Sequence, residues 1–129
     1  MTAPRPHPVS PAPFPLARNG CGLVFTSGLA AIDPATMTVS SAAFDDQAAE
    51  VFGQLDRALT AAGSTREQVL KLDCYLSDRR WFPAWNAAFT EYFSTAAPAR
   101  TTTVTTLPID GLLIEIQAIA VAANQEDRS

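Results

Sequence analysis

Residues 112–121 read LLIEIQAIAV, a long apolar stretch that a single charged residue, Glu115, interrupts. A continuous apolar run of this kind predicts a strand with little exposure to water. Residues 69–76, VLKLDCYL, alternate in polarity and predict a second strand whose two faces differ. The expected faces are Leu70, Leu72, Cys74 and Leu76 on one side, and Val69, Lys71, Asp73 and Tyr75 on the other. The chain is therefore built on a β-sheet.

Two helices are predicted beside these strands. Residues 45–62 carry an apolar stripe at helical spacing, and Gly63 suits the left-handed residue that follows a helix. The second helix begins near Phe82 after a cap at Asp78, because Pro83 fits only in a first turn, and it runs to about residue 93. Its apolar side consists of Phe82, Trp85, Phe89, Tyr92 and Phe93.

Shorter stretches complete the expected elements. Residues 22–28 and the β-branched run 101–107 predict strands, and residues 37–39 can pair back as another after a turn at 33–34. Residues 64–67, STRE, have the spacing of a capping box, which predicts one further short turn. The expected order is strand, strand, helix, strand, helix, strand, strand. With the two helices packed on one face of a mixed sheet, this is the order of an α+β domain.

We expect a single domain over residues 14–123, between a Pro-rich arm at 1–13 and a polar tail at 124–129. The chain has 129 residues, which suffices for one hydrophobic core but not for two. Its net charge of −4 disfavours nucleic acid as a partner, since nucleic-acid binding relies on a cationic surface. No transmembrane run or signal-peptide pattern is present, so no membrane partner and a cytoplasmic location are expected.

Several classes of catalytic site lack the residues that they need. The single histidine, His7, lies between two prolines, so a triad that depends on histidine is not expected. Cys21 and Cys74 are too few for a structural zinc site, and Cys74 is expected to be a small core residue. Neither a GxGxxG nor a GxxxxGK(S/T) motif occurs. We therefore expect no metal and no cofactor.

Four polar residues could carry chemistry, and each also has a plain structural explanation. Glu115 is either a solvent-facing strand residue or a carboxylate that orients or deprotonates water. Arg100, at the entrance of the 101–107 strand, is either a surface ion-pair residue or a planar fork for a carboxylate. Taken alone, Ser27 is an ordinary turn residue and Asn86 an ordinary helix-surface amide. No single one of these signals is specific.

Together, several motifs in the same order resemble the Rid family of YjgF-type proteins. The resemblance extends from about residue 14 to residue 121 and so covers nearly the whole domain. The motifs are GLVFTSG at 22–28, IDP at 32–34, DQA at 46–48, LDRALTAAGST at 55–65, VLKLDCYL at 69–76, FPAWNAAFTEYF at 82–93, PAR at 98–100, LP at 107–108 and IEIQAIA at 114–120.

The resemblance implies a chorismate-mutase-like α+β fold and a homotrimer whose sheets form a central barrel, with clefts between subunits. It also implies hydrolysis of reactive imines and enamines, such as 2-aminoacrylate, to a 2-keto acid and ammonia without metal or cofactor. By the family pattern, Arg100 grips the substrate carboxylate with help from the Thr102 amide, and Glu115 positions the attacking water. Ser27 and Asn86 match positions that line the same cleft.

Three positions depart from the family pattern. Phe14 stands where active deaminases usually have a tyrosine, and so lacks a hydroxyl that could hold water or the imine nitrogen. Leu29 replaces a usual glutamine and is expected to remove a polar group near the cleft. Thr102 replaces a common cysteine, which is a milder change because its backbone amide remains. The changes at Phe14 and Leu29 predict a larger, more apolar or otherwise altered substrate.

Three functions stay open at this point. The first is hydrolytic deamination of 2-imino and 2-enamino acids. The second is a diverged Rid-family protein that acts on a pathway-specific substrate. The third is a non-catalytic binder of small molecules. Family members have also been described as ribonucleases or translation inhibitors, but the acidic composition does not favour RNA binding.

Overall fold

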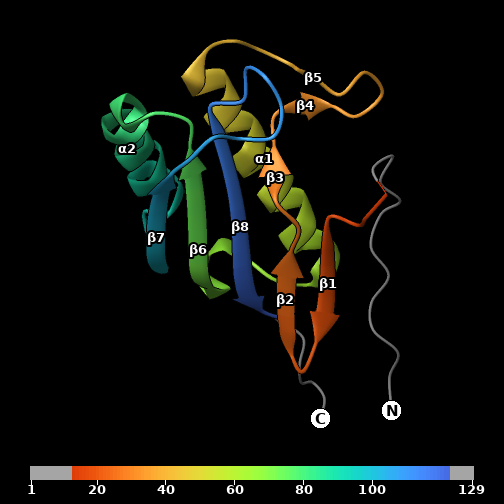
Figure 1. The fold of residues 1–129 in the computed structure, drawn as a ribbon. Helices are drawn as coiled ribbons and strands as arrows, with labels where there is room; N and C mark the ends of the chain where they lie inside the picture. Colours follow the sequence, from red (N-terminus) through yellow and green to blue (C-terminus); the bar gives the residue numbers. More distant parts are fainter. Residues whose placement is uncertain (1–12, 123–129) are drawn as a thin grey trace.

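Strand β8 (Ile114–Val121) lies inside a mixed sheet with the strand order β1-β2-β8-β6-β7 (Figure 1). The computed structural model describes residues 13–122. β8 is antiparallel to both of its neighbours, whereas β7 is parallel to β6. The other strands of this sheet are β1 (Ala17–Gly20), β2 (Leu23–Thr26), β3 (Leu29–Ala30), which also pairs with β8, β6 (Val69–Leu76) and β7 (Ala99–Val104). The apolar stretch thus occupies the interior of the sheet.

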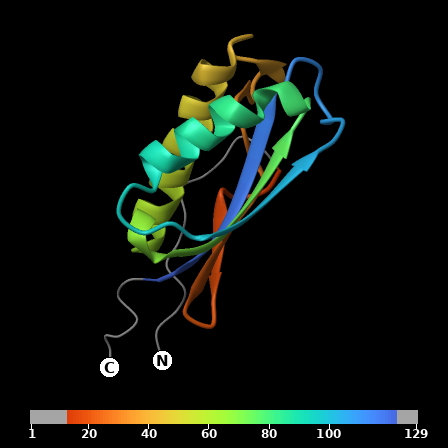
Figure 2. The ribbon, with the colours of Figure 1, turned by 90° about the vertical axis from the view of Figure 1, so that its left-hand side faces the viewer.

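Both helices cover the same face of this sheet (Figure 2). They are α1 (Phe44–Ala62) and α2 (Phe82–Tyr92). Short 3₁₀ turns, η1 (Arg66–Gln68) and η2 (Arg79–Trp81), precede β6 and α2, and a small hairpin of β4 (Ile32–Asp33) and β5 (Thr38–Val39) precedes α1. The predicted α+β fold, with two helices on one face of a mixed sheet, is confirmed.

The hydrophobic core fills the space between the helices and the sheet. Alternate residues of β8 are buried there, beginning with Ile114 and Ile116, and Trp85 of α2 is completely buried. Cys74 is buried as well, and burial raises the pKa of its thiol, an effect that the nearby Arg100 charge opposes only in part. The prediction that Cys74 is a core residue is therefore confirmed.

The first two residues of β6 differ from the sequence prediction. A β-bulge between Val69 and Lys71 shifts the register of β6 against β8. Val69 is consequently buried with Leu72, whereas Leu70 is 51% exposed. The assignment of Leu70 to the buried face, and of Val69 to the other, was wrong, because a bulge adds a residue to one strand and reverses the faces that precede it.

Other element boundaries also differ from those predicted from the sequence. β1 was not predicted, because its sequence ARNG has little strand character and its pairing with β2 is what makes it a strand. The strand expected over 101–107 begins at Ala99 and ends at Val104, where its partner β6 ends. The capping box at 64–67 does not form, since the Ser64 hydroxyl donates to the Val121 carbonyl instead. The short strand pairing at 37–39 and the left-handed Gly63 are confirmed.

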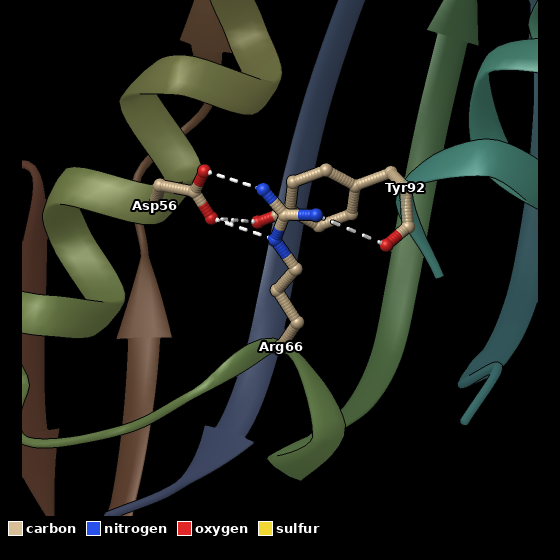
Figure 3. A network of polar contacts seen from close by, with 3 residues as sticks. All are labelled: Asp56, Arg66 and Tyr92. Atoms are coloured by element: carbon tan, nitrogen blue, oxygen red, sulfur yellow. Dashed lines mark hydrogen bonds and ion pairs between the residues drawn. The ribbon is translucent and has the colours of Figure 1, made fainter. Parts of the chain in front are cut away.

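A polar network on the outer side of the helices ties three elements together (Figure 3). Asp56 of α1 accepts hydrogen bonds from the Tyr92 hydroxyl at 2.5 Å and from the Arg66 guanidinium at 2.9 and 3.1 Å. Arg66 also stacks over the Tyr92 ring, with its Cζ 4.0 Å from the ring centroid. Burial opposes ionisation of Asp56, but these hydrogen bonds outweigh it and lower the pKa of Asp56. The network fastens η1 and the end of α2 to α1.

Gln47 fixes the start of α1 to the loop that leads into β8. Its side chain is completely buried, with Nε2 donating to the Ser41 and Gly111 carbonyls at 2.8 and 3.0 Å. Its Oε1 accepts from the Leu113 amide at 2.9 Å. Each side of this buried amide therefore has a backbone partner, as a buried polar group requires. Leu113 lies two residues before Glu115, so Gln47 helps to set where β8 begins.

The N-terminal arm up to residue 12, including His7, and the tail at 124–129 lie outside the described residues. Within residues 13–122, no helix is long and apolar enough to cross a membrane. The cytoplasmic location stays a prediction.

We predict that Gln47→Leu lowers the free energy of unfolding by about 2 kcal/mol or more, because it leaves buried backbone groups without partners. Urea denaturation followed by circular dichroism measures this loss. The matched control is Gln54→Leu on the same helix, where a partly exposed side chain makes one backbone hydrogen bond, to Ala30. The control should lose about 1 kcal/mol or less; an equal loss in both variants would contradict the role given to Gln47.

Candidate functional site

Arg100 is the second residue of β7, and its side chain lies under α2. Its Cζ lies 4.8 Å from the ring centroid of Phe89, 5.8 Å from that of Phe82 and 5.9 Å from that of Trp85. The side chain is half-buried, yet within residues 13–122 it forms no ion pair. Aromatic rings hold a guanidinium in place without neutralising its charge. The guanidinium of Arg100 is therefore ordered and, among residues 13–122, unpaired, which makes it suitable for binding an anion.

Thr102 lies two residues further along β7 on the same face. Its Oγ1 accepts a hydrogen bond of 3.0 Å from the indole Nε1 of Trp85. Because the hydroxyl accepts in this bond, its own hydrogen is free to donate elsewhere. Asn86 is partly exposed on α2, one turn after Phe82 and therefore on the same side of the helix. We call Arg100, Thr102, Asn86 and Phe82 the arginine half-site.

Glu115 lies on the other face of the sheet. Its neighbours Ile114 and Ile116 point into the core, so Glu115 points away from the helices. The carboxyl group covers Gly28, where a Cβ atom would collide with Glu115 Oε2. Partial burial raises the pKa of Glu115. A carboxylate with a raised pKa is a better proton acceptor, as general base catalysis requires.

Ser27 precedes Gly28, the glycine that the Glu115 carboxyl group covers, and its hydrogen bonds reach the segment that follows Phe14. The Ser27 hydroxyl donates to the Pro15 carbonyl at 2.6 Å while its amide donates to the Leu16 carbonyl at 2.8 Å. These bonds hold the segment that carries Phe14, whose ring is 51% exposed. We call Glu115, Ser27, Gly28 and Phe14 the carboxylate half-site.

One chain does not bring the two half-sites together. Arg100 pairs with Leu72, which faces the helices, whereas Glu115 pairs with Tyr75, which faces away from them. Residues that pair across a sheet point to the same side, so Arg100 and Glu115 lie on opposite faces. A site that uses both groups needs residues from two copies of the chain.

The face of the sheet opposite the helices combines polar and apolar side chains. Asp73 accepts from Lys71 Nζ at 2.6 Å and from Gln117 Nε2 at 3.4 Å. Beside this polar cluster, Phe25 is largely exposed and pairs with Ile119. An apolar area without cover from its own chain is typical of a surface that packs against another subunit.

Two residues, Leu29 and Phe82, were placed wrongly from the sequence, and the contact between Gly28 and Glu115 was missed. Leu29 is only 1% exposed and pairs with Ile116 in the core, so its replacement of glutamine does not alter a cleft. Phe82 was assigned to the apolar side of the helix, but its ring is 41% exposed beside Arg100. Its position four residues before Asn86 was a signal that could have identified it. Nothing in the sequence indicated that Gly28 contacts Glu115.

The described residues show no further ligand cluster. Within residues 13–122, no group of three His, Cys, Asp or Glu side chains lies close enough together to hold a metal ion.

The chain is similar to known proteins over nearly its whole length. Residues 7–122 match the protein family described as endoribonuclease L-PSP. A RutC family protein of Synechocystis sp. is 41% identical over 124 residues, which cover 94% of this chain and 93% of that protein.

Solved structures agree with this result. RidA from the Antarctic bacterium Psychrobacter sp. superimposes with a TM-score of 0.77 at 29% identity, covering 89% of this chain and 93% of that one. YyfA of Yersinia pestis, a Rid family protein of unknown function, gives a TM-score of 0.78 at 28% identity, covering 89% and 92% of the two chains.

We predict that Gly28→Ala lowers the pKa of Glu115 towards the ordinary value of glutamate, because the new methyl group pushes the carboxyl group out of its half-buried position. An NMR titration of the glutamate side chains measures this change. Gly20→Ala is the matched control, since nothing lies within 4 Å of its Cβ position. An unchanged Glu115 pKa in Gly28→Ala would show that the two residues are not in contact.

Proposed function

We propose that this chain, which belongs to the endoribonuclease L-PSP family and within it to the Rid (YjgF-type) proteins, hydrolyses reactive 2-imino and 2-enamino acids to 2-keto acids and ammonia. The observation that carries the proposal is the half-buried guanidinium of Arg100, which aromatic rings hold without an ion-pair partner among residues 13–122. A small anion is the ligand that such a group favours.

In this proposal, Arg100 binds the α-carboxylate of the substrate through its planar fork. The Thr102 amide or hydroxyl supplies a further donor, because Trp85 already holds the hydroxyl oxygen at 3.0 Å. Asn86 lies on the side of α2 where it can reach the same ligand. Fixing the carboxylate places the C=N carbon at a defined position for attack, which is the main contribution that a reactive substrate requires.

Glu115 acts on water. As a carboxylate, it accepts a proton while the water oxygen bonds to the imine carbon and the C=N bond becomes a single bond. Glu115 returns this proton to the nitrogen, which gives a carbinolamine with an amino group. The carbinolamine hydroxyl then passes its own proton to the nitrogen through Glu115, the C=O bond forms, the C–N bond breaks and ammonia leaves. Water is the only co-reactant, and no oxidant or reductant is needed. General acid–base help of this kind contributes roughly 10²–10⁴-fold.

The two half-sites must come from neighbouring copies, because they lie on opposite faces of one sheet. We propose a homotrimer in which the sheet faces without helices pack around a central axis and each cleft joins an arginine half-site to the partner's carboxylate half-site. The exposed Phe25 and its pair Ile119 supply apolar surface for such packing. Closed rings are the usual product of one repeated contact between different surface patches.

RNA cleavage, which the family description mentions, has less support. The net charge of −4 provides no excess of cationic residues for a phosphate backbone.

We predict that Arg100→Ala and Glu115→Gln each lose activity as pure oligomers, but that a mixture of the two variants recovers part of it. In randomly mixed rings, about one quarter of the interfaces combine an intact Arg100 from one copy with an intact Glu115 from the next. The assay is keto-acid release from an imine that an amino-acid oxidase produces in the same solution.

The control is each variant mixed with itself through the same dissociation and reassembly. Full activity in both pure variants would overturn the catalytic assignment. An inactive mixture with confirmed subunit exchange would overturn the shared cleft.

We predict that kcat/KM falls as the pH drops through the raised pKa of Glu115. Burial raises this pKa, and the carboxylate form is the active one, so the acid limb should have its midpoint above the ordinary glutamate value of about 4.3. The pH profile of the wild-type enzyme measures the midpoint, and Glu115→Gln should lack the limb. A midpoint at or below the ordinary value would show that Glu115 is not the base.

A further inference from the structure

Phe82 is an exposed aromatic residue at a fixed place beside Arg100. It is the first residue of α2, and its backbone is helical, with φ −60° and ψ −44°. Its ring centroid lies 5.8 Å from Arg100 Cζ, and 41% of the residue is exposed. Figure 1 shows how α2 passes over the edge of the sheet at β7. The Phe82 ring thus presents an exposed apolar surface directly beside the guanidinium.

The other two rings beside Arg100, those of Trp85 and Phe89, are packed in the hydrophobic core. Trp85 is completely buried, stacks on Phe52 and donates its only N–H to Thr102. Phe89 is buried and makes an edge contact with Trp85. Phe82 is therefore the one ring of the three that keeps a large free surface next to the guanidinium.

A ligand bound at Arg100 must meet this surface. When a carboxylate occupies the guanidinium fork, the rest of a 2-imino acid extends from it by one carbon, and the side chain starts at that carbon. Because the Phe82 ring lies directly beside the guanidinium, the side chain of a ligand held at Arg100 starts close to this ring. Phe14 adds a second exposed ring, at 51% exposure, to the carboxylate half-site that would close the same cleft. Both half-sites thus present apolar surface.

We infer that Phe82 is a specificity-determining residue, which makes the chain prefer 2-imino acids with a bulky apolar side chain over the smallest substrates. This inference rests on the proposed deaminase function. Contact between the substrate side chain and the Phe82 ring removes apolar surface of both from water, whereas a methyl or methylene group leaves most of the ring exposed. A difference of this kind in an apolar pocket is worth about tenfold or more in kcat/KM.

The experiment compares two imines, one derived from phenylalanine and one from alanine, each released by an amino-acid oxidase. In the wild-type protein, kcat/KM should be about tenfold or more higher for the phenylalanine imine. Phe82→Ala should remove most of this preference, because kcat/KM should fall much further for the phenylalanine imine than for the alanine imine. Phe82→Leu keeps apolar volume and should retain an intermediate preference. Met37→Ala, which removes an exposed apolar side chain from the β4–β5 turn, is the control and should keep the full preference.

The outcomes separate this inference from the function on which it rests. Hydrolysis of neither imine by the wild-type protein would refute the proposed function. Equal hydrolysis of both imines would leave that function intact and overturn the inference. An equal loss for both imines in Phe82→Ala would show a structural role and overturn it too. If Phe82→Ala does not fold, Phe82→Leu decides, since a preference in that variant that equals the wild-type preference would exclude a role of the ring.

Discussion

The alternation of side chains across the sheet constrains everything else in this molecule. Successive residues of β8 point to opposite faces, so the strand that places Ile114 and Ile116 in the core must direct Glu115 away from it. β7 obeys the same rule with the opposite result, because Arg100 pairs with the buried Leu72 and faces the helices. A one-residue shift of either strand would exchange these faces and expose the core, so the separation of the two charged groups is as firmly determined as the core itself.

This separation has an electrostatic consequence. Because they lie on opposite faces of the sheet, Arg100 and Glu115 of one chain do not form an ion pair with each other. Here the guanidinium is surrounded by Phe82, Trp85 and Phe89, and the carboxyl group lies over Gly28 with its pKa raised by burial. Each group therefore keeps the property that its proposed role requires. The guanidinium keeps an unneutralised charge for an anion, and the carboxylate keeps its affinity for a proton.

The remaining polar contacts do not touch Arg100 or Glu115. They fix the helices and the start of the strand that position these two residues. Gln47 joins the start of α1 to the backbone just before β8, and the network of Asp56, Arg66 and Tyr92 joins α1 to the far end of α2. The N-terminal part of α2 carries Phe82 and Trp85, so the helix that these bonds fasten is the one that shapes the surroundings of Arg100. Rigid support of this kind is what allows a few side chains to select a ligand.

The fold class, both helices and the strands at 69–76 and 112–121 could be predicted from the sequence, because helical and strand spacing of apolar residues reports local geometry directly. The resemblance of several ordered motifs also made Arg100 and Glu115 the candidate site residues. Leu70, Leu29 and Phe82 could not be placed in this way. A bulge, a pairing with β8 and the path of α2 over β7 decide their exposure, and these depend on contacts between residues far apart in the chain. The sequence by itself determined which functional side chains the protein contains and on which helices and strands they lie. Only the tertiary structure decided which face each group occupies, because a face is defined by the neighbouring strand and not by the residue.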